Sequence, residues 1–208
     1  MMSRYSIART PPCLLLAAVL LITASACTRT PKIKYYRLTP AGAETALLQQ
    51  TRTAAAVIGI GPVRLREHLD SSRLVTRIEA NSVEMAEYHR WAEQPAANIS
   101  WVLRDNLASL LDTEHIAVFP WDGATAVDFQ LEMEVLHLEG TAGNQARFDV
   151  LWQILGADGD RLLDRRRSSY RVAAASQEPD TLAAALSEAL WRLSIDVAEA
   201  LAGLAAER

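Results

Sequence analysis

Cysteine is nearly absent from this chain of 208 residues, and the only two, Cys13 and Cys27, lie close to its start. Two cysteines are too few for a disulfide framework or for a zinc site built from cysteines. Everything that follows Cys27 is free of cysteine. This scarcity excludes the class of small secreted domains that depend on disulfides. Cys27 therefore needs a role other than a disulfide or a zinc ligand.

An excess of charge of one sign is also lacking. The 21 basic side chains stand against 25 Asp and Glu side chains, which gives a net charge of −4. Such a balance provides no broad basic surface for phosphate contacts, so nucleic acid is a poor candidate partner. Half of the residues are hydrophobic and 22% are charged, which fits neither a disordered chain nor a polytopic membrane protein. The length fits one globular domain with a small appendage.

Familiar catalytic motifs are missing as well. The four histidines are scattered along the chain: His68, His89, His115 and His137. None has metal-ligand spacing from another histidine, and the Gly-x-Ser-x-Gly elbow of serine hydrolases does not occur. Glu84, Glu87 and His89 suggest a carboxylate and imidazole cluster, but a solvated strand edge explains them better. Gly59-Ile60-Gly61 lacks the third glycine of a dinucleotide loop, since that position is Arg64. We therefore expect no enzyme, no metal site and no bound cofactor.

The first 26 residues have the organisation of an export signal. Arg4 and Arg9 form a short positive region without acidic neighbours, and an apolar run follows from residue 13 to residue 22. A membrane-spanning helix needs about 20 apolar residues, so this run is too short to remain as a span. Residues 1–26 are therefore predicted to be a signal peptide.

Small residues lead directly from that run into Cys27, in the order Thr23-Ala24-Ser25-Ala26-Cys27. This order resembles the lipobox of bacterial lipoproteins, in which the cysteine receives a diacylglycerol thioether and, after cleavage, an acyl chain on its amine. The alternative is an ordinary cleavage site, Ala24-Ser25-Ala26, with Cys27 as a bystander. We favour lipidation because an unpaired cysteine at the start of an otherwise cysteine-free exported chain has no evident structural role. Acyl chains on Cys27 would hold the protein on a membrane.

The residue after the cysteine is Thr28 rather than aspartate. By resemblance to the sorting of such lipoproteins, this predicts transfer to the outer membrane. Residues 1–26 would be the lipoprotein signal peptide, residues 27–34 a lipidated tether and residues 35–208 a single domain. Removal of residues 1–26 takes away two arginines and no acidic residue, so the remaining 182 residues carry a net charge of −6.

Hydrophobic periodicity predicts an α+β domain in the rest of the chain. Strands are expected at 33–38, 56–63, 73–78, 82–86, 116–120, 127–135, 148–155 and 162–172. Amphipathic helices are expected from residue 95 to about 113 and from Pro179 onward, because leucines recur there at steps of three and four. The fold class is therefore a mixed, mainly antiparallel sheet, with a long antiparallel meander and two amphipathic helices packed on it.

Two further patterns have both a structural and a functional interpretation. Arg165, Arg166 and Arg167 form the only basic run; an exposed sheet edge explains it, and contact with lipid phosphates or an acidic partner is the alternative. Three tryptophans lie near helix starts and loop corners: Trp91, Trp101 and Trp121. We expect these tryptophans to fill the core rather than to form an interface hot spot.

Several segments together resemble one protein family. In chain order they are Ile58-Gly59-Ile60-Gly61-Pro62-Val63, Leu69-Asp70, Leu74-Val75-Thr76-Arg77, Ala86-Glu87-Tyr88-His89-Arg90-Trp91-Ala92-Glu93 and Phe119-Pro120-Trp121. This set resembles the PqiC (YmbA) family of ABC-type transport auxiliary lipoproteins. The similarity covers most of the chain, from Tyr35 to the final helix, and the Val-Thr-Arg and Arg-Trp-Ala-Glu stretches are its most specific parts.

The resemblance implies a non-catalytic lipoprotein of the outer membrane that faces the periplasm, with no cofactor beyond the covalent lipid on Cys27, palmitate among its acyl chains. It implies partners as well, namely an MCE-domain protein and an inner-membrane transporter subunit, which move lipids between membranes and maintain envelope integrity. A homo-oligomer also fits the family. Two alternatives stay open: a scaffold or assembly lipoprotein for an outer-membrane β-barrel, and a periplasmic lipoprotein that binds a small apolar ligand.

Overall fold

The computed structural model describes residues 31–42, 56–121, 125–141, 144–176 and 178–207. The predicted signal peptide at 1–26, the predicted lipidation site Cys27 and the first part of the tether lie outside these residues. Residues 33–208 form one compact unit.

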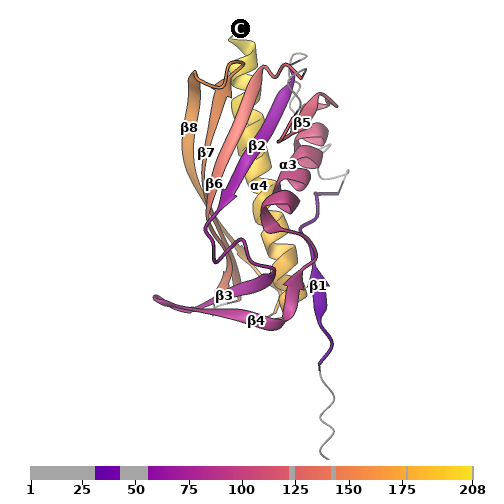
Figure 1. Ribbon diagram of the computed structural model, residues 1–208, viewed down its shortest axis with the longest axis vertical. Helices are drawn as coiled ribbons and strands as arrows, with labels where there is room; N and C mark the ends of the chain where they lie inside the picture. The colour runs from indigo at the N-terminus through magenta and orange to yellow at the C-terminus, as the bar shows by residue number, and fades with distance from the viewer. Residues whose placement is uncertain (1–30, 43–55, 122–124, 142–143, 177, 208) are drawn as a thin grey trace, which may run out of the picture. The chain divides into compact units, whose positions relative to one another are not determined.

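Eight strands form a mixed sheet. They are β1 (Lys34–Tyr36), β2 (Ile58–Leu65), β3 (Arg73–Glu79), β4 (Ser82–Trp91), β5 (Ile116–Val118), β6 (Phe129–Thr141), β7 (Gln145–Gly156) and β8 (Leu162–Ala173). β6 is central: one of its edges pairs with β2 and then with β3, and the other edge pairs with β7. Figure 1 shows β8, β7, β6 and β2 side by side, with β3 and β4 at the far end of β6.

The sheet combines antiparallel and parallel pairings. β6, β7 and β8 form the long antiparallel meander that the alternating pattern predicts, and β3 and β4 form the predicted hairpin. The pairings of β1 with β4, of β2 with β5 and β6, and of β3 with β6 are parallel. The α+β class and the mixed sheet are therefore confirmed.

Two helices, α3 (Pro95–Leu111) and α4 (Pro179–Ala206), pack on the sheet as predicted. Each begins with a proline, which suits the first helical turn because an N–H group there has no intrahelical partner. α4 contacts β6, β7 and β8, whereas α3 contacts β2 and β5, and the two helices contact each other. Neither of these described helices combines the length and hydropathy needed to cross a membrane.

The core lies between the helices and the inner face of the sheet. Alternate residues of the meander point into it and are at most 2% exposed: Phe129, Leu131, Met133, Val135, Phe148, Val150, Trp152 and Ile154. Helix leucines that are at most 1% exposed face them: Leu103, Leu107, Leu110, Leu186, Leu190, Leu193 and Leu201. Full burial of one such side chain stabilises the fold by about 1.5–3 kcal/mol. This packing holds the meander rigidly against α4.

Two buried asparagines of α3 fix the segment that follows β1. The Asn98 side chain accepts a hydrogen bond from the backbone N–H of Leu38 at 2.7 Å. The Asn106 side chain accepts from the N–H of Ala41 at 3.0 Å and donates to the Ser194 hydroxyl of α4 at 2.9 Å. These bonds satisfy polar groups that would otherwise be buried without partners.

An irregularity in β6 decides which of its residues face outward. The register with β7 shifts between Val135 and His137, as at a β-bulge. Beyond the shift, His137 lies opposite Asp149, and Glu139 lies opposite Arg147. Residues directly opposite each other share a face of the sheet, so these four polar side chains gather on the outer face, away from the helices.

Candidate functional site

The outer face of the sheet carries a cluster of charged side chains drawn from four strands. Its members are Arg77 of β3, His137 and Glu139 of β6, Arg147 and Asp149 of β7, and Arg171 of β8. We call this set the paired cluster. Pairing of the four strands brings residues distant in sequence close together. Because side chains alternate between the two faces of a strand, these six lie on one surface.

Glu139 is the most deeply buried member of the paired cluster, with 0% exposure. Arg77 Nε donates to its Oε1 at 2.7 Å, and Arg77 Nη2 donates to its Oε2 at 3.3 Å. Arg77 Nη1 also donates to the carbonyl of Ala80, in the turn between β3 and β4. This two-pronged contact is geometrically specific and ties the β3–β4 hairpin to the end of β6.

Asp149, 1% exposed, binds two arginines, Arg147 of its own strand β7 and Arg171 of the neighbouring β8. Arg147 Nη2 donates to Asp149 Oδ2 at 2.7 Å, and Arg171 Nη1 donates to Asp149 Oδ1 at 2.5 Å. Burial by itself raises the pKa of Asp149, but the hydrogen bonds from Arg171, Arg147 and Ser169 outweigh it and lower the pKa from 3.8 to about 2. Asp149 is therefore a carboxylate at any physiological pH.

His137 completes the paired cluster, with Nδ1 2.9 Å from Asp149 Oδ2. Burial lowers the pKa of His137 below 6.5, and the nearby Arg147 lowers it further, against the opposing influence of Glu139 and Asp149. With a neutral histidine, three arginines and two carboxylates leave the cluster a net charge of +1. Its carboxylates are occupied by arginines, so the arrangement suits structural pairing better than acid–base chemistry.

No group of three or more His, Cys, Asp or Glu side chains is arranged to hold a metal ion in the part of the chain that the structure describes. Glu84 and Glu87 are exposed on β4. The hydroxyl of Tyr36 lies 2.8 Å from His89 Nδ1. Glu84 and His89 line the same pocket beside the β3–β4 hairpin, whereas Glu87 is not part of its lining, so the three residues do not form one cluster.

The predicted basic run lies in β8, at one edge of the sheet, and all three arginines are exposed. Arg166 has an ion pair and a cation–π contact: its Nη2 lies 2.7 Å from Asp164 Oδ2, and its guanidinium lies 5.3 Å from the centre of the Trp152 ring. Such cation–π stacking stabilises by about 0.5–1 kcal/mol at an exposed site. The prediction that the three arginines lie exposed at a sheet edge is therefore confirmed.

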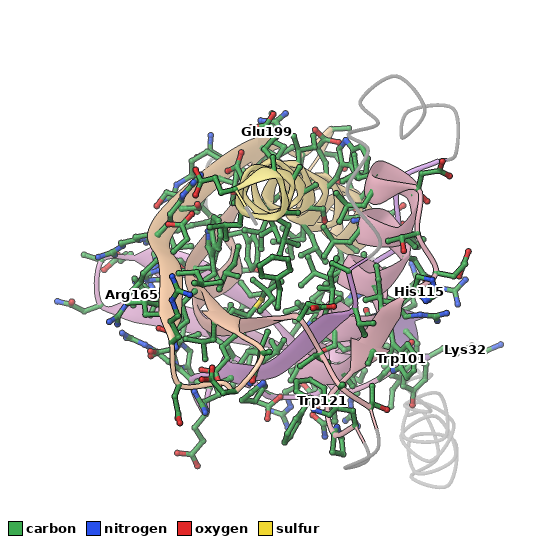
Figure 2. The ribbon with its side chains drawn as sticks, turned by 90° about the horizontal axis from the view of Figure 1, so that it is seen from above. Lys32, Trp101, His115, Trp121, Arg165 and Glu199 are labelled. Carbon is green, nitrogen blue, oxygen red and sulfur yellow. The ribbon has the colours of Figure 1, made fainter. Side chains whose placement is uncertain are left out.

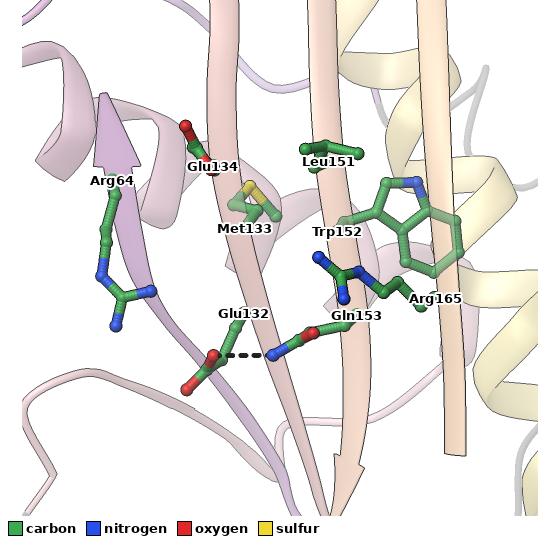
Figure 3. A pocket seen from close by; sticks show the side chains of 8 residues that line it. All are labelled: Arg64, Glu132, Met133, Glu134, Leu151, Trp152, Gln153 and Arg165. Atoms are coloured by element: carbon green, nitrogen blue, oxygen red, sulfur yellow. Dashed lines mark hydrogen bonds between the residues drawn. The ribbon is translucent and has the colours of Figure 1, made fainter. Parts of the chain in front are cut away.

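Arg165 and Arg167 occupy the outer face of β8, opposite Gln153 and Leu151 of β7. Figure 2 shows Arg165 at the margin of the molecule, on the side away from Trp101 and His115. Arg165 also flanks a shallow groove between β2 and β8 (Figure 3).

This groove has Arg64 of β2 on its other side and two acidic residues of β6, Glu132 and Glu134, between the arginines. Gln153 Nε2 donates to Glu132 Oε2 at 3.0 Å across its floor. The volume of about 110 Å³ is below the range of about 300–1,000 Å³ for small-molecule pockets. The outer face here suits contact with a macromolecule better than enclosure of a ligand.

The tryptophans do not share one role. Trp91 is 6% exposed and belongs to the core, as predicted. Trp121 lies over Gly59, where an added Cβ would stand 2.9 Å from its ring, so the glycine makes room for the indole. Trp101 is 49% exposed on α3, and Arg104 lies 5.6 Å from its ring. The prediction that Trp101 fills the core is therefore wrong.

The paired cluster was not predicted from the sequence. Asp149 stands at a polar position of the strand predicted at 148–155, and this alternation is the signal that could have placed it on the outer face. Arg77 comes from β3, whose parallel pairing with β6 the pattern does not reveal. The predicted lipid anchor at Cys27 lies outside the described residues and stays a prediction.

Comparison with known proteins gives a family and a fold. Residues 36–198 match the model of a family described as ABC-type transport auxiliary lipoprotein component. The search of curated proteins returned no match for the chain.

Two crystal structures resemble the described fold. One, of an uncharacterized protein, has a TM-score of 0.65 and 16% sequence identity, over 81% of this chain and 98% of that one. The other, of protein XCC0632 from Xanthomonas campestris, has a TM-score of 0.65 and 15% identity, over 83% of this chain and 95% of that one. At such identities the likeness shows a common fold.

Proposed function

The chain belongs to the family of ABC-type transport auxiliary lipoprotein components, and from this premise we propose that it is a non-catalytic subunit of an MCE-type intermembrane lipid transport system. The observation that carries the proposal is the family match over residues 36–198. That range includes every segment on which the resemblance to the PqiC (YmbA) family rests. Envelope integrity would depend on the subunit because lipid supply between the membranes depends on the assembly.

In this proposal Cys27 carries the lipid and residues 27–34 tether the domain to the outer membrane, facing the periplasm. The small residues before Cys27 and the threonine after it support this location. Two or three acyl chains hold a protein far more firmly than one, because each buried methylene adds about 0.8 kcal/mol.

The folded domain would act by docking the MCE-domain protein and the inner-membrane subunit. Its charged outer face supports such a role. Arg64 and Arg165 flank a groove with Glu132 and Glu134 at its centre, and this alternation of sign gives a surface that can select a partner by charge. The outer face is also backed by a tightly packed core, so a docking partner would meet a rigid surface.

The anchor is tested by replacing Cys27 with alanine and by using Cys13→Ala as the matched control. We expect Cys27→Ala to abolish incorporation of labelled palmitate and to release the protein into the soluble periplasmic fraction. Cys13→Ala should keep both the label and the outer-membrane fractionation on a sucrose gradient. The anchor proposal fails if the Cys27→Ala protein still fractionates with the outer membrane.

The partner is tested by purifying the full chain in mild detergent from cells that produce the MCE-domain protein and its inner-membrane subunit. We expect both proteins to co-purify, and we expect detergent sensitivity of a deletion strain to be rescued by the wild type and by Cys13→Ala only. Co-purification of β-barrel assembly components instead would support the scaffold alternative. Absence of both sets of proteins would contradict docking altogether.

One structural feature favours the alternative of a small apolar ligand. A pocket of about 400 Å³ lies between the β3–β4 hairpin and the first turns of α4, with Ile78, Ala86 and Leu182 among its apolar lining. This volume lies within the range of small-molecule sites. Mass spectrometry of lipid extracted from the purified protein, compared with the Ala86→Trp variant, tests this role. A stoichiometric lipid that Ala86→Trp excludes would support it, and an empty wild-type protein would contradict it.

A further inference from the structure

β8 is a long edge strand that is paired on one side only. It spans twelve residues and pairs with β7, and no strand among the described residues lies on its other side. Figure 1 shows it at the margin of the sheet. The edge strands β1 and β5 have three residues each. Native proteins usually keep edges short or covered, because unpaired N–H and C=O groups accept another strand. The length of β8 therefore points to an edge that is kept available.

Contacts on both faces hold β8 in position. On the inner face, the Tyr170 hydroxyl donates to Asp196 of α4 at 2.5 Å, and the Tyr170 ring stacks on Phe148 with centroids 6.1 Å apart. On the outer face, Arg171 binds Asp149 of the paired cluster. An edge that is already ordered loses little conformational freedom when a further strand pairs with it.

The charge of β8 selects the kind of strand that can pair with it. The strand contains four arginines and one aspartate. Arg166 and Arg171 have carboxylate partners within the molecule, whereas no ion pair to Arg165 or Arg167 is found among the described residues. Arg165 and Arg167 are two residues apart, so they face the same side of an added strand.

The same charge opposes pairing between two copies of the chain. Two β8 strands placed edge to edge would bring two net positive strands together, and like charges across neighbouring strands are destabilising. Charged residues on an edge strand are a common protection against such self-association. A partner strand with carboxylates at alternate positions has no such penalty and gains charge-assisted contacts instead.

We propose that β8 is the docking edge for an extended acidic segment of a protein partner, which pairs with β8 as a further strand and places alternate carboxylates against Arg165 and Arg167. Backbone hydrogen bonds would supply much of the affinity, and the two arginines would supply the selectivity. The inference rests on the proposed function in one respect: the partner is taken to be a protein of the transport assembly.

The test uses the full chain in detergent and three labelled peptides of roughly eight residues, which is within the usual range of strand lengths. The first alternates Glu and Val, the second alternates Lys and Val, and the third alternates Glu and Pro. We expect saturable binding of the Glu-Val peptide, measured by fluorescence anisotropy, and little binding of the other two. The Glu-Pro peptide keeps the charge but lacks half of the N–H donors, so it separates strand pairing from simple charge attraction.

The matched variants are Arg165→Glu/Arg167→Glu and, as a control with the same change in net charge, Arg104→Glu/Arg192→Glu on the exposed sides of α3 and α4. We expect the β8 double variant to weaken binding of the Glu-Val peptide by about tenfold, since two surface charge pairs are lost. The helix double variant should bind within about twofold of the wild type. Circular dichroism and urea unfolding of both variants establish that they are folded.

Hydrogen exchange gives the second, independent measurement. Pairing of the Glu-Val peptide should slow exchange of backbone amides in β8 and leave amides of α3 unchanged. Equal binding of the Glu-Val and Glu-Pro peptides, or unchanged protection of β8, would overturn the inference.

Two other occupants are distinguished by the same variants. Dimers in native mass spectrometry that disappear in the β8 double variant would assign the edge to a second copy. Binding to phosphatidylglycerol vesicles that depends on Arg165 and Arg167, without binding of the Glu-Val peptide, would assign it to a lipid surface. Either result overturns the inference.

Co-purification separates the inference from the proposed function. If the MCE-domain protein co-purifies equally with the β8 double variant, the inference fails while the proposed function stands. If the Glu-Val peptide binds but no MCE-domain protein co-purifies, β8 is a docking edge and the proposed function fails.

Discussion

Two halves of the same sheet face use charge in opposite ways. In the half that contains the paired cluster, Glu139 and Asp149 are 0% and 1% exposed, and arginines occupy both carboxylates. In the other half, which we call the open half (Arg64, Glu132, Glu134, Arg165 and Arg167), Glu134 and the two β8 arginines are exposed. Both halves lie mainly on the three strands of the meander, with Arg77 of β3 added to one half and Arg64 of β2 to the other.

The difference comes from what surrounds each charge. A buried carboxylate has lost its hydration, so the loss of its arginine partners is strongly destabilising. An exposed arginine keeps its hydration and is screened by salt, so its removal changes stability little. The paired cluster therefore holds β3, β6, β7 and β8 together, while the exposed charges of the open half, among them Glu134, Arg165 and Arg167, stay available for contact. Burial, rather than the number of charges, separates a structural role from a docking role.

The largest effect that tests this contrast is expected from Asp149→Asn. The substitution keeps the size of the side chain but removes the charge that binds Arg147 and Arg171. Breaking a buried ion pair costs about 3–5 kcal/mol, and we expect about 3 kcal/mol because the two arginines are 25% and 37% exposed and regain some hydration. Urea unfolding measures this loss.

The matched control for that substitution is Glu134→Gln, on the adjacent strand in the open half. It should change the free energy of unfolding by no more than about 0.5 kcal/mol. Equal losses for the two variants would mean that the halves do not differ in the way described.

The pH dependence of the free energy of unfolding, compared between the wild type and Asp149→Asn, gives a second, smaller effect. The pKa of Asp149 is lower in the folded protein than in the unfolded chain, so its contribution is complete above 3.8 and is lost as the pH falls through about 2. The stability difference between the wild type and Asp149→Asn should therefore narrow across this interval.

His137 also titrates in acid, with a pKa lowered by burial, so both proteins should carry His137→Asn to remove its contribution. Unfolding of these two proteins by urea at a series of pH values makes the measurement. A difference that stays constant down to pH 2 would show that Asp149 is not held as a carboxylate by its arginines.

The strands and helices themselves are predictable because their signals are local. Alternation of apolar and polar residues located the meander, and leucines at helical spacing located α3 and α4. The exposure of Trp101 was predictable on the same principle, since it lies two residues from both Ile99 and Leu103 and therefore off their face of the helix. The expectation failed because it relied on residue type instead of position.

The paired cluster could not be predicted from such local patterns, for a physical reason. Arg77 and Glu139 are 62 residues apart in the chain and meet through the parallel pairing of β3 with β6. The irregularity before His137 then determines which side chains at the end of β6 face outward. Strand pairing and bulges depend on packing of the whole sheet, whereas alternation depends on neighbours in sequence.

The smallest effect, and the sharpest comparison, comes from two arginines of one strand. Arg167 and Arg171 both lie on the outer face of β8, but Arg171 binds Asp149 and Arg167 belongs to the open half. Arg171→Ser should lower the free energy of unfolding by about 1.5–3 kcal/mol, because a charge-assisted hydrogen bond to a buried carboxylate is lost. Arg167→Ser should stay within about 0.5 kcal/mol. Salt screens an exposed charge, so any small effect of Arg167→Ser should shrink further in high salt, whereas the deficit of Arg171→Ser should persist. A loss for Arg167→Ser as large as that for Arg171→Ser would mean that Arg167 is engaged within the molecule and is not available to a partner.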